Sequence, residues 1–230
     1  MKRFWKEAAV VEREDGWGVV LDGRDVQTPA RKALVVPSEA LANAIADEWN
    51  TVGEGDIDPR DMPLTGLANA AIDRIENGRD AFADELAGFA TSELCCYRAD
   101  HPDALAEREA EAWDPLLDWA AQRYDVAFER TSGIAPVDQP ETTLERLAGA
   151  VRSEDAFALA GLTPLVRIGG SLVAALAVRH GAVAPEAAWD AVEVDRLYQN
   201  EQWGADEEAE KAAAARRADF LAGARFLELL

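Results

Sequence analysis

Residues 8–21 read AAVVEREDGWGVVL, two runs of strand-forming residues on either side of an Asp-Gly pair. Asp-Gly between apolar runs is a strong short-range signal of a β-hairpin. A second Asp-Gly pair at residues 22–23 and an apolar run at residues 33–36, closed by Pro37, continue the pattern. The stretch therefore predicts a small antiparallel sheet.

The pattern changes to that of a helix at Ser38. Leu41, Ile45 and Trp49 recur every four residues, and Ser38 is a favourable N-cap for the helix that they define. One face of this helix is apolar, so we expect it to cover one face of the sheet.

The rest of the chain is predicted to be almost entirely helical, with Gly and Pro residues between the segments. We therefore predict an α+β fold of two domains. Residues 1–58 form a small antiparallel β-sheet domain with one covering helix, and residues 59–230 form a larger α-helical domain that resembles an orthogonal bundle.

The composition excludes several classes of function. The 230 residues include 23 Lys and Arg against 44 Asp and Glu, which gives a net charge of −21. Nucleic acids and anionic membranes attract positive surfaces, so we expect no nucleic-acid partner. We also expect no membrane insertion, because Arg167 and Arg179 interrupt the most apolar region, residues 156–183, well short of the roughly 20 residues of a spanning helix.

Two features indicate the compartment. Cys95 and Cys96 are adjacent, which suits a structural disulfide poorly and indicates buried, reduced thiols. The N-terminal residues lack the apolar core of a signal peptide and the Arg- and Ser-rich composition of a transit segment. We expect a protein of a reducing cell interior, with no signal for export.

The sequence offers little material for catalysis. It contains no phosphate-binding loop, dinucleotide fingerprint, nucleophile elbow or zincin motif. Cys95, Cys96 and His101 lack the paired spacing of a zinc site, and the acidic loop at residues 56–61 lacks the Gly and Glu that a calcium loop requires. We expect no catalytic residues, no metal and no cofactor.

One carboxylate lies where an apolar residue is expected. Ala187, Ala191, Val194 and Tyr198 follow helical spacing in residues 185–203, and the next position of this stripe is Glu201. Such a carboxylate is paired with an Arg of the chain, is hydrogen-bonded, lies in solvent at a frayed helix end, or faces a cation of a partner. Trp203 follows it, and a Trp beside polar residues is typical of an interface hot spot.

Seven short strings run through about nine-tenths of the chain. They are Arg3-Phe4-Trp5-Lys6 with residues 16–24 and Thr28-Pro29; residues 41–49; Met62-Pro63-Leu64-Thr65 with Ala71-Ile72-Asp73; residues 94–99; Trp113-Asp114-Pro115-Leu116-Leu117; Ser171-Leu172 with Ala177-Val178; and Tyr198-Gln199-x-Glu201-x-Trp203-Gly204-x-Asp206. Together, and in this order, they resemble one family, the assembly chaperones of F-type ATP synthase that bind the free alpha subunit.

The resemblance implies a molecular chaperone without enzymatic activity, whose transient partner is the ATP synthase alpha subunit before it pairs with beta. It implies a place in the bacterial cytoplasm, or in the mitochondrial matrix for eukaryotic relatives, and we favour a monomer. The candidate client-binding residues are Glu201 and Trp203, followed by Gln199, Asp195 and Glu193. By contrast, Trp49 and the Trp113 string have the helical spacing of core residues.

Two other classes of function stay open from the sequence. The first is an enzyme with an acidic cleft between the two domains that acts on a cationic small molecule, which would require several carboxylates of raised pKa around a deep pocket. The second is a permanent structural subunit of the finished ATP synthase.

Overall fold

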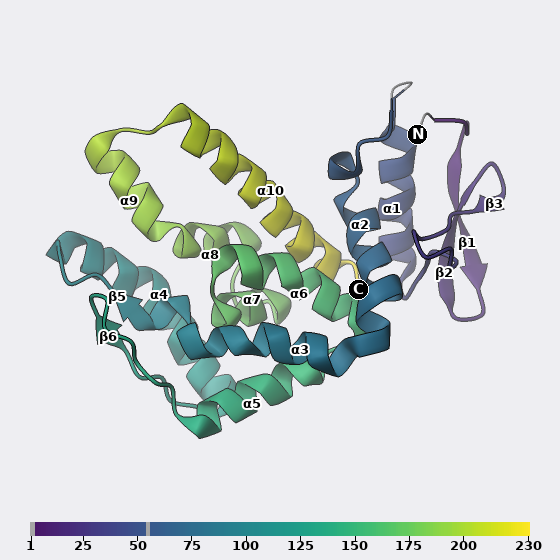
Figure 1. The fold of residues 1–230 in the computed structure, drawn as a ribbon. Helices are drawn as coiled ribbons and strands as arrows, with labels where there is room; N and C mark the ends of the chain where they lie inside the picture. Colours follow the sequence, from purple (N-terminus) through teal and green to yellow (C-terminus); the bar gives the residue numbers. More distant parts are fainter. Residues whose placement is uncertain (1–2, 54–55) are drawn as a thin grey trace. The chain divides into compact units, whose positions relative to one another are not determined.

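A computed structural model describes residues 3–53 and 56–230. The chain divides into two compact units (Figure 1). Unit 1 comprises Met1–Arg79, Asp155–Gly161 and Arg225–Leu230, and unit 2 comprises Asp80–Glu154 and Leu162–Ala224. The α+β fold class is confirmed. The predicted domain boundary after residue 58 stays a prediction, and the compact units divide the chain at other places.

Unit 1 contains the predicted sheet. Its strands are β1 (Ala8–Arg13), β2 (Gly16–Leu21), β3 (Arg24–Asp25) and β4 (Val35–Val36). The hairpin of β1 and β2 is antiparallel, with Ala8 opposite Leu21 and Arg13 opposite Gly16, and β3 and β4 both pair with β2. Gly16 has a φ of 142°, and a Cβ there would lie 2.4 Å from the carbonyl oxygen of Val36, so only glycine fits this end of the hairpin.

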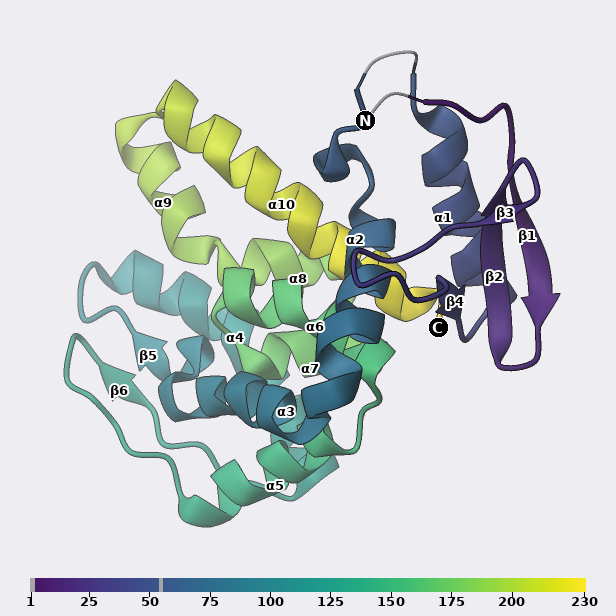
Figure 2. The ribbon, with the colours of Figure 1, turned by 45° about the vertical axis from the view of Figure 1, so that its right-hand side comes forward.

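Helix α1 (Glu39–Thr51) packs on β1 and β2, as the two ribbon views show (Figures 1 and 2). The predicted N-cap is confirmed, because Ser38 Oγ accepts a hydrogen bond of 3.0 Å from the Leu41 N–H. Leu41, Ile45 and Trp49 are buried, and the Trp5 indole N–H donates to the Trp49 carbonyl at 3.3 Å. The apolar stripe that was read from the sequence is therefore the face that covers the sheet.

Two carboxylates join the remaining segments of unit 1. These segments are the 3-10 turn Pro59–Asp61, helix α2 (Pro63–Ala70), a π-helical turn at Ala71–Ile75 and a 3-10 turn at Glu76–Gly78. Glu48 of α1 accepts hydrogen bonds from the N–H groups of Leu64 and Thr65 at 2.7 and 2.8 Å, which caps the start of α2. Asp73 accepts from the Thr28 hydroxyl at 2.7 Å and thereby fixes the loop after β3.

Unit 2 is helical apart from one short parallel pair of strands. Its elements are α3 (Arg79–Ala87), 3-10 turns at Gly88–Ser92 and Leu94–Cys96, β5 (Tyr97–Arg98), α4 (Asp103–Tyr124), β6 (Thr131–Ser132), α5 (Glu141–Arg152), α7 (Leu172–Arg179), α8 (Pro185–Val192) and α9 (Val194–Trp203). Helices α6 (Ala156–Gly169) and α10 (Glu207–Glu228) contribute residues to both units. No helix in the described ranges is long and apolar enough to cross a membrane.

The core of unit 2 gathers around Trp113 of α4. Its members are Cys95, Cys96, Trp113, Leu116, Leu117, Ala120, Val173, Ala174, Ala177 and Ala191. Both cysteines are buried free thiols, as expected from their adjacency. The Trp113 indole N–H donates to the Ala191 carbonyl at 2.6 Å, which joins α4 to α8 inside this core.

Gly161 of α6 provides a test of packing within unit 1. A Cβ at this position would lie 2.7 Å from Cγ and Cδ2 of Leu227. We expect Gly161→Ala to lower the free energy of unfolding, because overpacking costs about 1–3 kcal/mol and outweighs the gain in helix propensity of about 1 kcal/mol. Gly149→Ala in α5 is the matched control, since its Cβ meets no atom within 4 Å and should stabilise by about 0.5–1 kcal/mol. Urea denaturation of both variants measures the difference, and equal effects would contradict this account.

Candidate functional site

The segment that carries the candidate residues is two helices rather than one. The single helix expected over residues 185–203 is interrupted at Glu193, which lies between α8 and α9 with φ −104° and ψ 11°. The expected apolar stripe holds only in part, because Ala191 and Tyr198 are buried while Ala187 is exposed. The interruption gives α9 its own direction, and this sets which of its side chains face solvent.

Glu193 is buried at this turn. Its carboxylate pairs with Arg196 of α9 and lies 3.3 Å from the guanidinium of Arg216 in α10. Arg196 in turn binds Glu210 of α10 at 2.6 Å. Glu193 therefore links α9 to α10, and its charge is compensated inside the chain.

Asp195 faces a second buried carboxyl group. One of its carboxylate oxygens is buried and has no hydrogen-bond partner within the described part of the chain. Burial raises the pKa of Glu109 in α4 to about 7, and the hydrogen bond and charge of Asp195 act in the same direction. The Ala99 N–H donates to Glu109 at 2.7 Å and opposes this shift. Because Glu109 is only 2% exposed and lies near Asp195, its carboxyl group is more easily buried in the protonated form than in the charged form.

Glu201 forms an ion pair with Arg108 of α4. The pair measures 2.7 Å, and the side chains are 53% and 42% exposed. The Arg108 guanidinium also lies 5.1 Å from the centre of the Tyr198 ring. Of the alternatives open from the sequence, the structure contains the pairing with an Arg of the chain, and it leaves the Glu201 carboxylate accessible from solvent.

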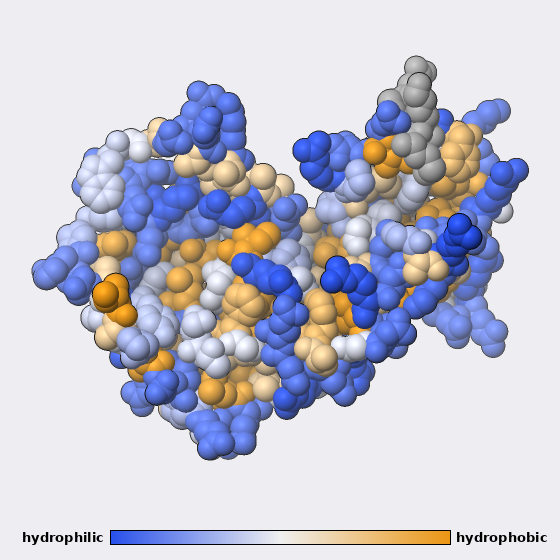
Figure 3. All heavy atoms as spheres, viewed as in Figure 1, coloured by the Kyte–Doolittle hydropathy of each residue, from blue (hydrophilic) through white to orange (hydrophobic). Residues whose placement is uncertain are grey.

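Trp203 lies at the end of α9 and is 78% exposed. Gln199, one turn earlier, is also exposed, and Gly204 ends the helix with a φ of 86°. Figure 3 shows mostly hydrophilic side chains over α9 and the start of α10, with apolar side chains gathered in the middle of the helical unit. Trp203 is thus a large aromatic side chain that the core of the chain does not use.

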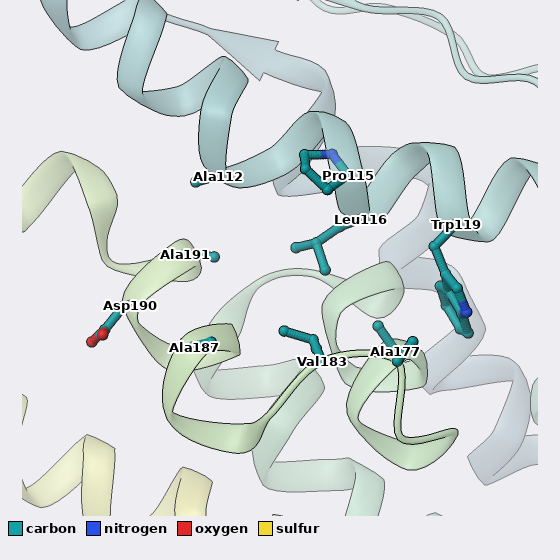
Figure 4. Close-up of a pocket in the computed structure, with 10 residues that line it drawn as sticks. Ala112, Pro115, Leu116, Trp119, Ala177, Val183, Ala187, Asp190 and Ala191 are labelled. Carbon is teal, nitrogen blue, oxygen red and sulfur yellow. The ribbon is translucent and has the colours of Figure 1, made fainter.

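A pocket of about 310 Å³ lies among α4, α7 and α8 (Figure 4). Its lining residues are Ala112, Pro115, Leu116, Trp119, Ala177, Ala182, Val183, Ala187, Asp190 and Ala191. Leu116 and Val183 point toward each other across it, whereas Asp190 points away from the other labelled residues. The pocket is an apolar hollow with one carboxylate at its edge.

A second pocket of about 480 Å³ in unit 2 is polar. Its two carboxylates are already paired with arginines, Asp125 with Arg146 at 2.5 Å and Glu154 with Arg179 at 3.2 Å. His180 also lines it, and burial lowers the pKa of that imidazole. Neither pocket gathers several carboxylates of raised pKa, the feature that the enzyme alternative requires.

Sequence reasoning missed Arg108 and Glu109. The signal was available for Glu109, because it occupies the apolar stripe of Leu105, Trp113 and Leu116 in α4, just as Glu201 continues the stripe in the following segment. The α4 stripe contains Glu109 and the α9 stripe contains Glu201, a pattern that fits two helices in contact through polar side chains.

The carboxyl pair predicts a pH dependence of stability. An unfolded Glu has a pKa of about 4.3. Since the pKa of folded Glu109 is about 7, the folded chain holds an extra proton between these values, and stability from this group falls as pH rises toward 7. Glu109→Gln should remove this part of the fall and be more stable than the parent at pH 8. Thermal unfolding at pH 5 to 8 measures it, with exposed Glu107→Gln as the control, and an unchanged pH profile would contradict a raised pKa of Glu109.

The comparisons with known proteins agree with the resemblance. A family model described as ATP12 chaperone protein matches residues 2–121. The mitochondrial protein atp12 of Schizosaccharomyces pombe is 26% identical over 219 residues, which cover 90% of this chain and 75% of that protein.

Two solved structures are similar over nearly the whole chain. The crystal structure of Atp12 from Paracoccus denitrificans is 43% identical, has a TM-score of 0.94 and aligns 99% of this chain with 97% of that one. The crystal structure of the Atu1473 protein from Agrobacterium tumefaciens is 37% identical, has a TM-score of 0.94 and aligns 99% of this chain with 85% of that one. The chain belongs to the ATP12 chaperone protein family.

Proposed function

We propose that this chain, a chaperone of ATP synthase assembly, binds the unassembled alpha subunit and covers its apolar surface until beta replaces it. Subunits of an obligate ring expose the apolar surfaces that their neighbours will bury, and such surfaces aggregate. A chaperone acts by binding, and in this proposal the chain catalyses no reaction. The free, buried Cys95 and Cys96 fit a reducing compartment such as the bacterial cytoplasm.

The observation that carries the proposal is the exposure of Trp203. An exposed Trp loses favourable burial unless a partner covers it, and Trp is enriched among the residues that dominate binding energy. Gln199 and Glu201 lie one turn or less away on α9 and supply polar groups around this anchor. We place the centre of the client-binding surface on these three side chains.

The other family strings supply internal contacts instead. Glu48 caps the Leu64 string, Asp73 holds the Thr28 string, and Trp113 binds the carbonyl of Ala191. These strings therefore have a structural role in the fold, and they need no contact with a client to account for them. The last string differs, because Gln199 and Trp203 lie outside the core, and in residues 3–53 and 56–230 neither side chain forms a hydrogen bond or ion pair.

Glu193 and Asp195 have a supporting role in this proposal. Glu193 is held by Arg196 and Arg216, and Asp195 faces Glu109. These contacts orient α9 between α4 and α10. We propose that both residues fix the direction of the binding helix, while Glu201, Trp203 and Gln199 contact the client.

The acidic composition fits this role. Residues 190–230 contain ten acidic and five basic side chains, and the first turn of α10 is acidic at Glu207, Glu208 and Glu210. Negative charge keeps a complex with an aggregation-prone client in solution and attracts basic regions of that client. We therefore expect association with the alpha subunit to slow as salt rises.

Trp203→Ala tests the proposal directly. Purified chain should bind alpha alone, should not bind beta alone, and should reduce alpha aggregation at equimolar ratio. The variant should lose at least about tenfold in affinity, because removing a hot-spot Trp costs about 2 kcal/mol or more. Its thermal stability should hardly change, since the side chain is exposed. Ile134→Ala is the matched control, as Ile134 is a fully exposed apolar residue outside α9. A parent chain that neither binds alpha nor reduces its aggregation would overturn the proposal.

The pair of Arg108 and Glu201 predicts opposite effects of two substitutions. If a cation of alpha takes the place of Arg108, Glu201→Gln should weaken binding and Arg108→Gln should strengthen it by up to about fivefold, the value of an exposed ion pair. Titration calorimetry with purified alpha measures both. If both substitutions weaken binding equally, Glu201 acts by holding α9 on α4 and not by contacting the client.

A further inference from the structure

We propose that the pocket among α4, α7 and α8 receives an apolar side chain of the alpha subunit that is flanked by Arg or Lys. The inference rests on the proposed function for the identity of the partner. It adds a second anchor point, separate from the surface around Trp203. The pocket is apolar, and its edge carries carboxylates and a backbone carbonyl that a basic side chain can bind.

The hollow exists because small side chains meet there. Five of its ten lining residues are alanines, contributed by α4, α7, α8 and the loop between the last two. Leu116, Ala177 and Ala191 are buried and form its floor, while Pro115 and the half-buried Trp119 form a wall on α4. An apolar side chain inserted there would contact carbon atoms on several sides.

The edge of the pocket is acidic. Glu186 and Asp190 lie one turn apart on the exposed side of α8, and Glu111 lies one turn before Pro115 on α4. None of the three forms an ion pair within residues 3–53 and 56–230. Two cations flank the lining residues along α4: Arg108, which Glu201 holds, and Arg123, which lies 3.2 Å from the Nδ1 atom of His180. A partner that supplies Arg or Lys next to its apolar residue therefore complements this edge.

Pro115 adds a backbone acceptor to the same edge. It stands inside α4 and has no N–H, so the carbonyl of Glu111 lacks the hydrogen bond that it would accept in a regular helix. This carbonyl lies on the face of α4 that carries the Pro115 ring. A guanidinium or ammonium group could donate to it while an adjacent apolar side chain enters the pocket.

Charge and shape favour this occupant over two others. A second copy of the chain would bring another −21 charge to an acidic edge, which opposes self-association through this face. A small molecule prefers a site that encloses most of its surface, but Pro115, Ala182 and Ala187 at this pocket are exposed, and its volume is at the lower end of the roughly 300–1,000 Å³ of ligand sites. A side chain of a partner protein, by contrast, can bind in an open pocket, because only the end of that side chain has to be buried.

Filling the pocket tests the inference. Ala187→Phe places a large side chain in the opening from an exposed position, so it should leave the thermal stability of the chain unchanged. We expect it to lower the affinity for purified alpha subunit by at least about tenfold, the loss of one anchor residue. Ala182→Phe, from the loop side of the pocket, should do the same. The matched control is Ala212→Phe, at an exposed alanine of α10 outside the pocket, which should bind as the parent does.

Removing charge tests the edge. The double variant Glu186→Gln and Asp190→Asn should bind alpha more weakly by about threefold or more and show a smaller dependence on salt than the parent. The control removes two other exposed carboxylates of α10, Asp219→Asn with Glu228→Gln, so its net charge equals that of the test variant, and it should bind as the parent does. Equal weakening of binding by both double variants would contradict a role of this edge.

The outcomes separate the two proposals. If the parent binds alpha, Trp203→Ala weakens binding, and both pocket fillers bind within twofold of the parent, the pocket inference is wrong and the proposed function stands. If the parent does not bind alpha, the proposed function fails and alpha is excluded as the occupant. If sedimentation shows a dimer of the parent that Ala187→Phe dissociates, the pocket receives a second copy and the inference is overturned.

Discussion

The hydrogen bond from the Trp113 indole to the Ala191 carbonyl is the contact on which the helical unit depends. At 2.6 Å it satisfies two polar groups that would each be costly to bury alone. Ala191 lies in the last turn of α8, where carbonyls have lost their helical partners, so the indole ends that helix as a cap would. The Arg98 guanidinium lies 5.0 Å from the Trp113 ring centre and adds a cation–π contact.

Both surfaces proposed for the client follow from that end of α8. Because the helix stops before Glu193, α9 starts in a new direction, which buries Tyr198 and leaves Gln199 and Trp203 in solvent. Ala191 itself forms part of the floor of the apolar pocket. The carbonyl that binds Trp113 and the methyl group that lines the pocket thus belong to one residue, so the core and the binding surfaces are built together.

Some carboxylates of this acidic chain are buried and accept hydrogen bonds from the backbone, while others lie on the surface. Glu48 accepts hydrogen bonds from Leu64 and Thr65, and Glu93 accepts them from the N–H groups of Cys95 and Val173 at 3.3 and 3.1 Å. Burial raises the pKa of both groups because each loses hydration, and the backbone donors oppose this shift. Composition therefore indicates a negative surface but does not tell which acids lie on it. Partners from distant segments decide that for each one.

The sequence by itself determined the features that depend on neighbours along the chain. The hairpin of residues 8–21, the Ser38 cap and the burial of Trp49 and Trp113 follow from turn chemistry and from periods of two and 3.6 residues, and the order of short strings indicated the family. Only the tertiary structure decided the break at Glu193, the pairing of Glu201 with Arg108, the raised pKa of Glu109 beside Asp195, and the pocket. Glu193 contacts Arg216 of α10, and the other three features join α4 to residues more than fifty positions later, so no local pattern records which helix faces which. Their energies come from desolvation and close packing, which exist only once the helices meet.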